Sequence, residues 1–219
     1  MPRNAELDAA ITRCPLIAIL RGVRPDEIDG VSDVLVEAGF SMIEIPLNSP
    51  DPLNSISRLA KRHGRSTLVG AGTVLAVDQV EAVVAAGGQM IISPNTNVAV
   101  IKAAAANELV SLPGYFTPTE ALSALAAGAS GLKLFPAEAA DPTVLKAQRA
   151  VLPGATPIFA VGGVTPDLMQ PWLTAGATGF GLGSALYRPG ATPAEVSTEA
   201  SRFVGALRSN TIDVALTCK

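Results

Sequence analysis

The chain has 219 residues, of which 48% are hydrophobic and 16% charged, and its formal net charge at pH 7 is −3. This length and composition predict a well-packed globular protein rather than a disordered one, and no apolar stretch approaches the roughly 20 residues that a membrane-spanning helix needs. The small negative charge gives no electrostatic reason to bind nucleic acid or an anionic membrane, so we expect a cytoplasmic protein with neither kind of partner.

A short unit recurs along the chain: a turn with proline or aspartate, an amphipathic helix, a helix end of small residues, and a short apolar strand. After an acidic N-terminal helix, the pattern predicts helices over residues 24–38, 77–86, 117–127 and 165–175. The third begins with Thr117-Pro118-Thr119-Glu120, which has the spacing of a capping box. Strands are expected at residues 16–20, 41–45, 67–71, 89–93, 109–112, 131–136, 157–161 and 178–181.

Eight short strands that alternate with helices predict an α/β protein whose strands pair in parallel through right-handed crossovers. Eight such units in about 200 residues are typical of a single (β/α)8 TIM barrel at the compact end of its size range. An open, doubly wound sheet is the alternative, because the pattern alone does not show closure. We expect one domain over residues 1–208, including the N-terminal helix, and a loosely packed C-terminal tail over residues 209–219.

The histidine and cysteine content argues against a metal enzyme. His63 is the only histidine, and it lies in Lys61-Arg62-His63-Gly64, which is typical of a helix C-terminus with Gly64 as the left-handed cap. Cys14 and Cys218 stand at opposite ends of the chain, without metal-ligand spacing or a disulfide framework. A zinc-dependent aldolase or hydrolase needs several histidine ligands, so we expect no metal and no cofactor.

Lys133 stands in the middle of the apolar run Gly131-Leu132-Lys133-Leu134-Phe135-Pro136, which is typical of a short buried strand. Burial disfavours the charged ammonium group and therefore lowers the pKa of a lysine. A neutral amine at pH 7 is a nucleophile toward a carbonyl carbon. From this run alone, the alternative is a lysine at a strand end with a buried stem and a solvated head.

Three further polar residues, Arg21, Glu44 and Thr73, lie at or near the ends of other strands, where the sites of barrel enzymes form. If Lys133 attacks a ketone, Glu44 is the candidate general acid and base. Arg21 can clamp a substrate carboxylate, and Thr73 can add a hydrogen bond. The alternative is a lysine–glutamate–arginine ion network that closes the barrel mouth.

Two glycine-containing segments follow the last two strands. Gly162 and Gly163 come after the seventh strand, and Gly183 and Ser184 come after the eighth. Loops in these places, completed by a helix N-terminus, form a recurrent phosphate site in such barrels, because glycine lets backbone N–H groups approach phosphate oxygens. A plain turn and a helix cap are the alternatives.

Four motifs that contain Arg21, Thr73, Lys133, Gly162 and Gly163 resemble those of the bacterial class I aldolases that cleave 2-keto-3-deoxy-6-phospho sugar acids. The resemblance covers residues 15–203 and includes Ile19-Leu20-Arg21-Gly22, Gly70-Ala71-Gly72-Thr73-Val74, Lys133-Leu134-Phe135-Pro136 and Gly162-Gly163. Asn48 and Val161 resemble the galactonate branch of the family, since the gluconate branch usually has arginine and threonine there.

The resemblance implies that Lys133 forms a Schiff base and that Glu44 moves protons. It implies substrate contacts from Arg21 and Thr73 near the pyruvate-derived end, Val161 near the stereocentre, and Gly162, Gly163, Gly183 and Ser184 at the phosphate. It also implies a homotrimer that releases pyruvate and D-glyceraldehyde 3-phosphate in galactonate catabolism. The alternatives are an aldolase for the gluconate epimer or for both epimers, a phosphate-binding barrel isomerase or epimerase with Glu44 as base, and a non-catalytic barrel that binds a phosphorylated metabolite.

Overall fold

The computed structural model describes residues 4–217, and the side chains of residues 4–209. In this part of the chain, nine parallel strands form one sheet in the order β5-β4-β3-β2-β1-β9-β8-β7-β6. The strands are β1 (Leu16–Ile19), β2 (Met42–Pro46), β3 (Leu68–Gly72), β4 (Met90–Ile92), β5 (Val110–Leu112), β6 (Gly114–Tyr115), β7 (Leu132–Leu134), β8 (Ile158–Val161) and β9 (Gly179–Leu182).

The sheet closes into a barrel because β5 and β6 are two halves of one strand. Only Pro113, which has no N–H to donate to a ladder, separates them. The backbone N–H of Lys133 in β7 donates to the carbonyl of Pro113 at 2.9 Å, and that of Ser130 donates to the carbonyl of Ser111 in β5 at 2.9 Å. The expected single (β/α)8 barrel is therefore confirmed, and the open doubly wound sheet is excluded.

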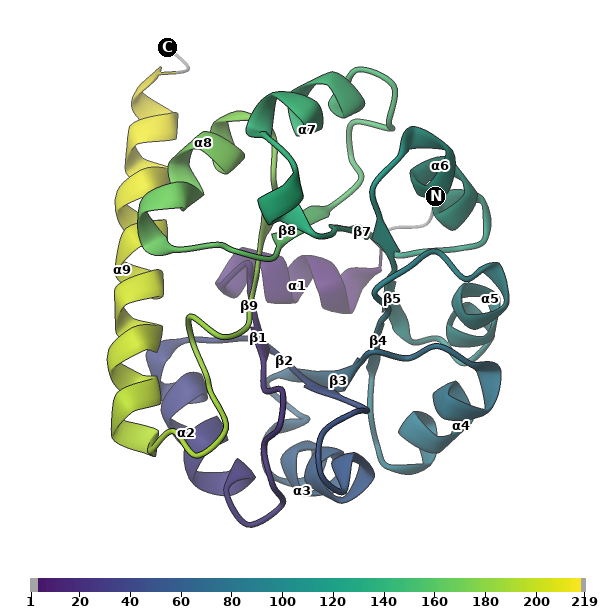
Figure 1. Cartoon of the computed structure of the whole chain (residues 1–219), viewed down its shortest axis with the longest axis vertical. Helices are drawn as coiled ribbons and strands as arrows, with labels where there is room; N and C mark the ends of the chain where they lie inside the picture. Colours follow the sequence, from purple (N-terminus) through teal and green to yellow (C-terminus); the bar gives the residue numbers. More distant parts are fainter. Residues whose placement is uncertain (1–3, 218–219) are drawn as a thin grey trace.

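Helices surround the barrel, as the view down its axis shows (Figure 1). They are α1 (Ala5–Arg13), α2 (Ile28–Ala38), α3 (Pro52–His63), α4 (Val77–Ala85), α5 (Val98–Ala106), α6 (Pro118–Ala126), α7 (Pro142–Arg149), α8 (Met169–Thr174) and α9 (Pro193–Thr217), with short 3-10 helices η1 (Ala137–Ala139) and η2 (Pro166–Leu168). The capping box predicted before α6 is confirmed: the Thr117 side chain accepts from the Glu120 N–H, and the Glu120 carboxylate accepts from the Thr117 N–H.

The barrel interior is apolar and closed at one end. The inward side chains form one cluster: Ile17, Ile19, Met42, Leu68, Met90, Ile92, Val110, Leu112, Phe159 and Val161. Leu7 and Ala10 of α1 pack into the same cluster, which places α1 across the amino-terminal end of the strands (Figure 1). The opposite end, where the strands have their carboxyl termini, is left for the functional site.

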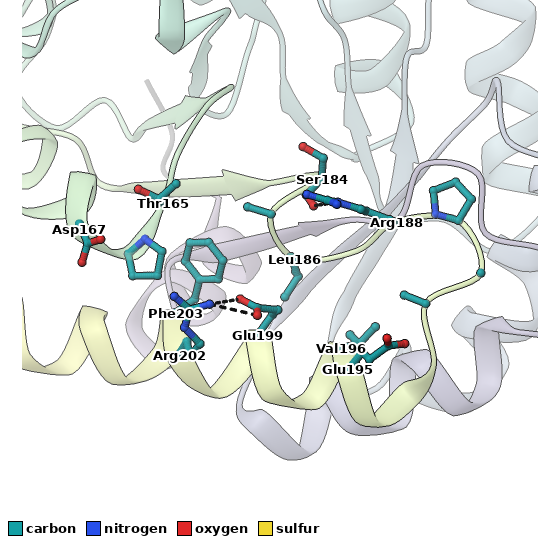
Figure 2. A pocket seen from close by; sticks show the side chains of 15 residues that line it. Thr165, Asp167, Ser184, Leu186, Arg188, Glu195, Val196, Glu199, Arg202 and Phe203 are labelled. Atoms are coloured by element: carbon teal, nitrogen blue, oxygen red, sulfur yellow. Dashed lines mark hydrogen bonds and ion pairs between the residues drawn. The ribbon is translucent and has the colours of Figure 1, made fainter.

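Helix α9 packs against α2 and α8 along one side of the barrel. Its Val196 and Phe203 side chains are buried (Figure 2). The tail expected from Ser209 onward falls within the backbone of α9, which runs to Thr217. Loose packing of residues 209–219 stays a prediction, because the side chains beyond Ser209 and residues 218–219 lie outside the described part.

His63 ends α3 as expected, but the predicted left-handed conformation of Gly64 is wrong. Gly64 has a right-handed φ of −60°, and its N–H donates to the Ala60 carbonyl at 2.9 Å. A Cβ atom at Gly64 would lie 2.5 Å from that carbonyl oxygen. Glycine is therefore needed here for a close approach of backbone to backbone.

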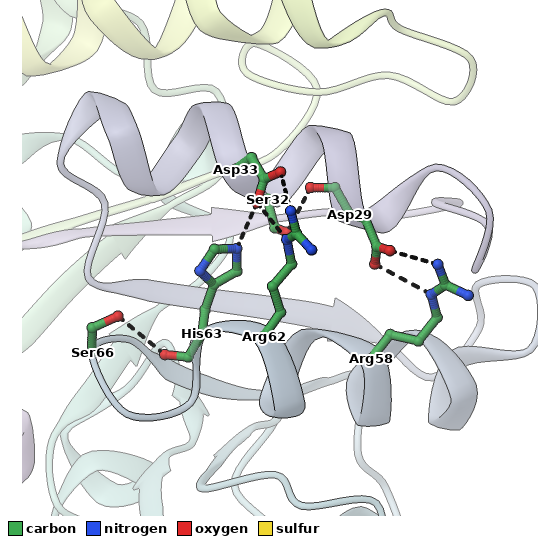
Figure 3. A network of polar contacts seen from close by, with 7 residues as sticks. All are labelled: Asp29, Ser32, Asp33, Arg58, Arg62, His63 and Ser66. Atoms are coloured by element: carbon green, nitrogen blue, oxygen red, sulfur yellow. Dashed lines mark hydrogen bonds and ion pairs between the residues drawn. The ribbon is translucent and has the colours of Figure 1, made fainter.

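His63 belongs to a polar network that joins α2 to α3 (Figure 3). Its Nε2 lies 3.0 Å from Asp33 Oδ1, and Arg62 donates twice to the same carboxylate at 2.6 Å. Arg58 makes a similar pair with Asp29 one turn away. These ion pairs are partly exposed, so each contributes about 0–1 kcal/mol and fixes helix register more than it stabilises the fold.

Candidate active site

A cavity of about 690 Å³ opens at the carboxyl end of the barrel. Eight of the nine predicted site residues line it: Arg21, Thr73, Lys133, Val161, Gly162, Gly163, Gly183 and Ser184. The ninth, Glu44, is buried beside the cavity and interacts electrostatically with Lys133 and Arg21. The structure thus brings together residues from six different strands or the loops that follow them.

Lys133 projects from the centre of β7 into the apolar interior. The residue is only 7% exposed, and its Nζ lies 4.7 Å from the centroid of the Phe135 ring. A small chamber in the barrel interior borders the lysine, and its other lining residues are all apolar or glycine: Ile17, Ile19, Ile92, Leu112, Phe159, Val161 and Gly181. Burial lowers the pKa of Lys133, the Glu44 carboxylate opposes this shift, and the positive charge of Arg21 adds to it. The predicted direction of the shift is confirmed.

Glu44 projects inward from β2 and is 1% exposed. Burial raises the pKa of this carboxyl group to about 7, against the lowering effects of Lys133, Arg21 and a hydrogen bond from the Gly72 N–H. Its Oε2 atom is buried and has no hydrogen-bond partner among the described residues. A carboxyl group with a pKa near 7 can both accept and donate a proton at neutral pH.

Gly72 creates the space that Glu44 occupies. A Cβ atom at this position would lie 2.0 Å from Glu44 Oε2. Any other residue at the end of β3 would therefore displace the carboxyl group.

Arg21 reaches across the mouth toward the loops after β2 and β3. Its Nη1 donates to Asn48 Oδ1 at 2.5 Å, and its Nη2 makes a longer contact of 3.4 Å with Thr73 Oγ1. Thr73 has a positive φ of 58°, which is uncommon for a residue other than glycine and marks a constrained loop. Among the described residues no ion pair joins Glu44 to Arg21 or to Lys133, so the alternative of a closed ion network is not what the structure forms.

The two glycine loops come together on one wall of the cavity. Gly162 and Gly163, directly after β8, have positive φ values of 111° and 66°. Gly183 and Ser184 follow β9, and a Cβ atom on Gly183 would meet no heavy atom within 4 Å. Val161 is 5% exposed and lies between these loops and the lysine, where its methyl groups pack closely on Gly181.

Five polar residues of the cavity wall were not among the predicted site residues: Asn48, Glu138, Thr165, Tyr187 and Arg188. Glu138 lies in η1, close enough to Gly163 that a Cβ atom there would be 2.9 Å from its Oε2. Arg188 lies beside Ser184, to whose carbonyl its Nε donates at 3.1 Å (Figure 2). The signal that could have identified Arg188 is its position: it is the one cationic residue in the segment that follows β9 as far as α9.

Within residues 4–217, no three histidine, cysteine or acidic side chains are grouped as metal ligands would be. In the same part of the chain, none of the helices is long and apolar enough to cross a membrane.

The fold and the site together define a (β/α)8-barrel enzyme with a buried lysine and a buried carboxyl group at its mouth. The family model for KDPG and KHG aldolases matches residues 7–196, and the chain belongs to that family. It is therefore an aldolase, a lyase that acts on carbon–carbon bonds.

Known relatives cover nearly the whole chain. A probable 2-dehydro-3-deoxy-6-phosphogalactonate aldolase of Rhizobium meliloti is 52% identical over 192 residues, which is 88% of this chain and 91% of the relative. The 2-dehydro-3-deoxy-6-phosphogalactonate aldolase of Escherichia coli is 46% identical over 197 residues, 90% of this chain and 96% of the relative. A solved structure described as native KDPGal superposes with a TM-score of 0.90 at 45% identity and covers 91% of this chain and 97% of its own.

Proposed function

We propose that this aldolase cleaves 2-dehydro-3-deoxy-6-phospho-D-galactonate to pyruvate and D-glyceraldehyde 3-phosphate through a Schiff base on Lys133. The observation that carries the proposal is a buried lysine with a lowered pKa in the same cavity as two glycine loops. The identity of the sugar acid is inferred from the names of the two relatives. The work of the enzyme would then belong to galactonate catabolism.

In this mechanism the neutral Lys133 Nζ attacks the C2 ketone, and loss of water from the resulting carbinolamine leaves an iminium ion. The C3–C4 bond then breaks, its electron pair moves toward the iminium nitrogen to form an enamine, and the C4 hydroxyl loses its proton as the aldehyde forms. Protonation of the enamine at C3 and hydrolysis release pyruvate and restore the amine.

Glu44 is the proposed proton carrier. With a pKa of about 7 it can take the C4 hydroxyl proton and later supply a proton to C3, and its unpartnered Oε2 is free to bond to a hydroxyl group or a water. Gly72 supports this role, because it leaves room for the carboxyl group and donates a hydrogen bond to it.

The remaining residues are proposed to position the two ends of the substrate. Arg21 and Thr73 would bind the carboxylate of the pyruvate-derived end, and Gly162, Gly163, Gly183 and Ser184 would bind the phosphate. Val161 lines the same cavity and offers no hydrogen bond to the C4 hydroxyl, at which the galactonate and gluconate substrates differ. Because valine at this position resembles the galactonate branch, we expect the galactonate epimer to be preferred. Values of kcat/KM measured on both epimers check this, and a preference for the gluconate epimer would contradict the role proposed for Val161.

Reductive trapping tests the Schiff base. The protein is incubated with pyruvate, reduced with borohydride, and weighed intact by mass spectrometry. A covalent increment that disappears in Lys133→Met supports the proposal, and Lys102→Met, which removes an exposed lysine of α5, is the matched control. Absence of any adduct at saturating pyruvate would refute it and would leave base chemistry on Glu44, as in an isomerase or epimerase, as the better explanation.

We further propose a cytoplasmic homotrimer. The support for self-association is a group of exposed apolar side chains on and before three consecutive helices, α4 to α6: Leu75, Val77, Val84, Val98, Phe116 and Leu122. Light scattering coupled to gel filtration gives the number of chains directly. A monomer at micromolar concentration would contradict the trimer without affecting the aldolase mechanism.

A further inference from the structure

The active-site cavity at the barrel mouth, here called the mouth cavity, adjoins a second cavity of about 700 Å³ that lies between the loop after β9 and helix α9. Thr165, Ser184 and Arg188 line both cavities. Figure 2 shows the Arg188 side chain directed back along this loop toward Ser184, whereas Arg202 stands on α9, on the far side of the second cavity. The two arginines therefore occupy different environments.

A phosphate bound between the glycine loops is held more strongly when a positive charge supplements the backbone N–H groups. Backbone N–H donors carry only partial charge, while hydrogen bonds between a guanidinium and a phosphate are charge-assisted and stronger. Three cationic side chains line the mouth cavity, Arg21, Lys133 and Arg188. The first donates to Asn48 and Thr73, and the second is buried in the barrel interior.

Arg188 is the remaining cation, and its geometry leaves it available. Only its Nε is engaged, by the Ser184 carbonyl, and its two terminal nitrogens donate to no other protein atom in the described part of the chain. The contact holds the guanidinium beside the loop whose N–H groups would face the phosphate. The Glu138 carboxylate lies close to Gly163 in the other glycine loop and would repel an anion.

We infer that Arg188 is a specificity-determining residue: its guanidinium binds the phosphate of the substrate and offsets the repulsion from Glu138, so that the enzyme prefers phosphorylated substrates. This inference rests on the proposed function and extends it, since the glycine loops alone would bind the phosphate with little net charge.

The test compares two aldehydes in the synthetic direction, where pyruvate adds to D-glyceraldehyde 3-phosphate or to D-glyceraldehyde. The measured quantity is the ratio of kcat/KM for the phosphorylated aldehyde to that for the unphosphorylated one. Arg188→Gln should lower this ratio by about 10- to 100-fold, as expected for loss of a charge-assisted contact, and Arg188→Lys should restore part of it. Arg202→Gln is the matched control, because Arg202 pairs with Glu199 at 2.8 Å and does not line the mouth cavity.

Pyruvate trapping with borohydride on the same variants distinguishes a failure of the role inferred for Arg188 from a failure of the proposed function. If Arg188→Gln still forms the adduct and keeps the wild-type ratio, the inference about Arg188 is wrong and the proposed function stands. An equal fall of the ratio in Arg202→Gln would also overturn the inference, since the effect would then be one of general surface charge. If the wild-type protein forms no adduct, the proposed function fails and this inference fails with it.

Discussion

Replacing Gly72 by alanine tests whether catalysis depends on the position of the Glu44 carboxyl group. The added Cβ atom would lie 2.0 Å from Glu44 Oε2 and 2.4 Å from its Cδ and Oε1. Non-bonded heavy atoms settle at separations of roughly 3.5 Å, so the carboxyl group must move by about 1 Å or more. The substitution therefore displaces the proposed proton carrier without changing its chemistry.

The size of this displacement indicates how much folding stability and how much catalytic rate the substitution should cost. Overpacking in a filled interior costs roughly 1–3 kcal/mol of folding free energy, which leaves a protein of ordinary stability folded. A displacement of about 1 Å in a reacting group costs roughly 10²-fold in rate, and complete loss of an acid–base group costs about 10²–10⁴-fold. We expect kcat to fall within this range while pyruvate can still be trapped on Lys133.

The assay measures kcat for pyruvate release at pH 7 together with the free energy of unfolding from a urea titration. Gly154→Ala is the control, since a Cβ atom there meets no heavy atom within 4 Å, and both quantities should stay at wild-type values. If Gly72→Ala remains folded and keeps the wild-type kcat, the carboxyl group does not act from the place where the structure puts it, and the role proposed for Glu44 is wrong.

Four further outcomes are expected. Because the pKa of Glu44 is raised to about 7, the folded state keeps a proton between about pH 4.5 and 7 that the unfolded state has lost, and the free energy of unfolding therefore declines as pH rises through this range. Glu44→Gln should remove up to roughly 3 kcal/mol of that decline. Equal pH profiles of unfolding in the wild type and the variant would contradict the raised pKa. Val161→Thr should raise kcat/KM for the gluconate epimer relative to the galactonate epimer by about tenfold or more. If this ratio does not change, Val161 does not discriminate between the epimers. Gly183→Ala should leave the melting temperature unchanged and weaken binding of the phosphorylated aldehyde a few-fold, as competition assays can show. Activity should persist in excess EDTA, and inhibition reversed by zinc would overturn the metal-free mechanism.

The sequence predicts the barrel well because its units are local. Each strand is a short apolar run, and each helix end is marked by small residues, so the eight predicted strands all appear within a residue or two of their expected bounds. Closure could not be predicted, since it depends on Pro113 interrupting one strand so that its two halves pair with different neighbours. The prediction of a left-handed Gly64 is wrong because glycine is used both where φ is positive and where two backbone segments approach closely, and the sequence does not distinguish these two uses.

The site also has residues that the sequence could predict and residues that it could not. Lys133, Glu44 and Arg21 could be predicted because strand alternation alone places them at one mouth. Arg188 is harder to predict, because its being the one cation between β9 and α9 does not show where its side chain lies: the loop leaves the strand at Leu182, six residues earlier, and a tertiary contact with Ser184 sets the position of the guanidinium. Side chains on regular elements inherit their direction from the backbone period, whereas those on loops depend on tertiary contacts.

The apolar interior of the barrel has one consequence for both catalytic groups. Burial lowers the pKa of Lys133 and raises that of Glu44, so each is driven toward its neutral form, while their mutual attraction favours the charged pair. The neutral pair is what the first step needs: an amine that attacks the ketone and an acid that can supply the proton for loss of water. The Arg21 charge affects the balance on both sides, because it favours the neutral amine and the charged carboxylate. Since no ion pair holds Lys133 and Glu44 in contact, the apolar wall around them rather than a salt bridge decides which form prevails, and a polar substitution in that wall should impair the chemistry even where it touches no substrate.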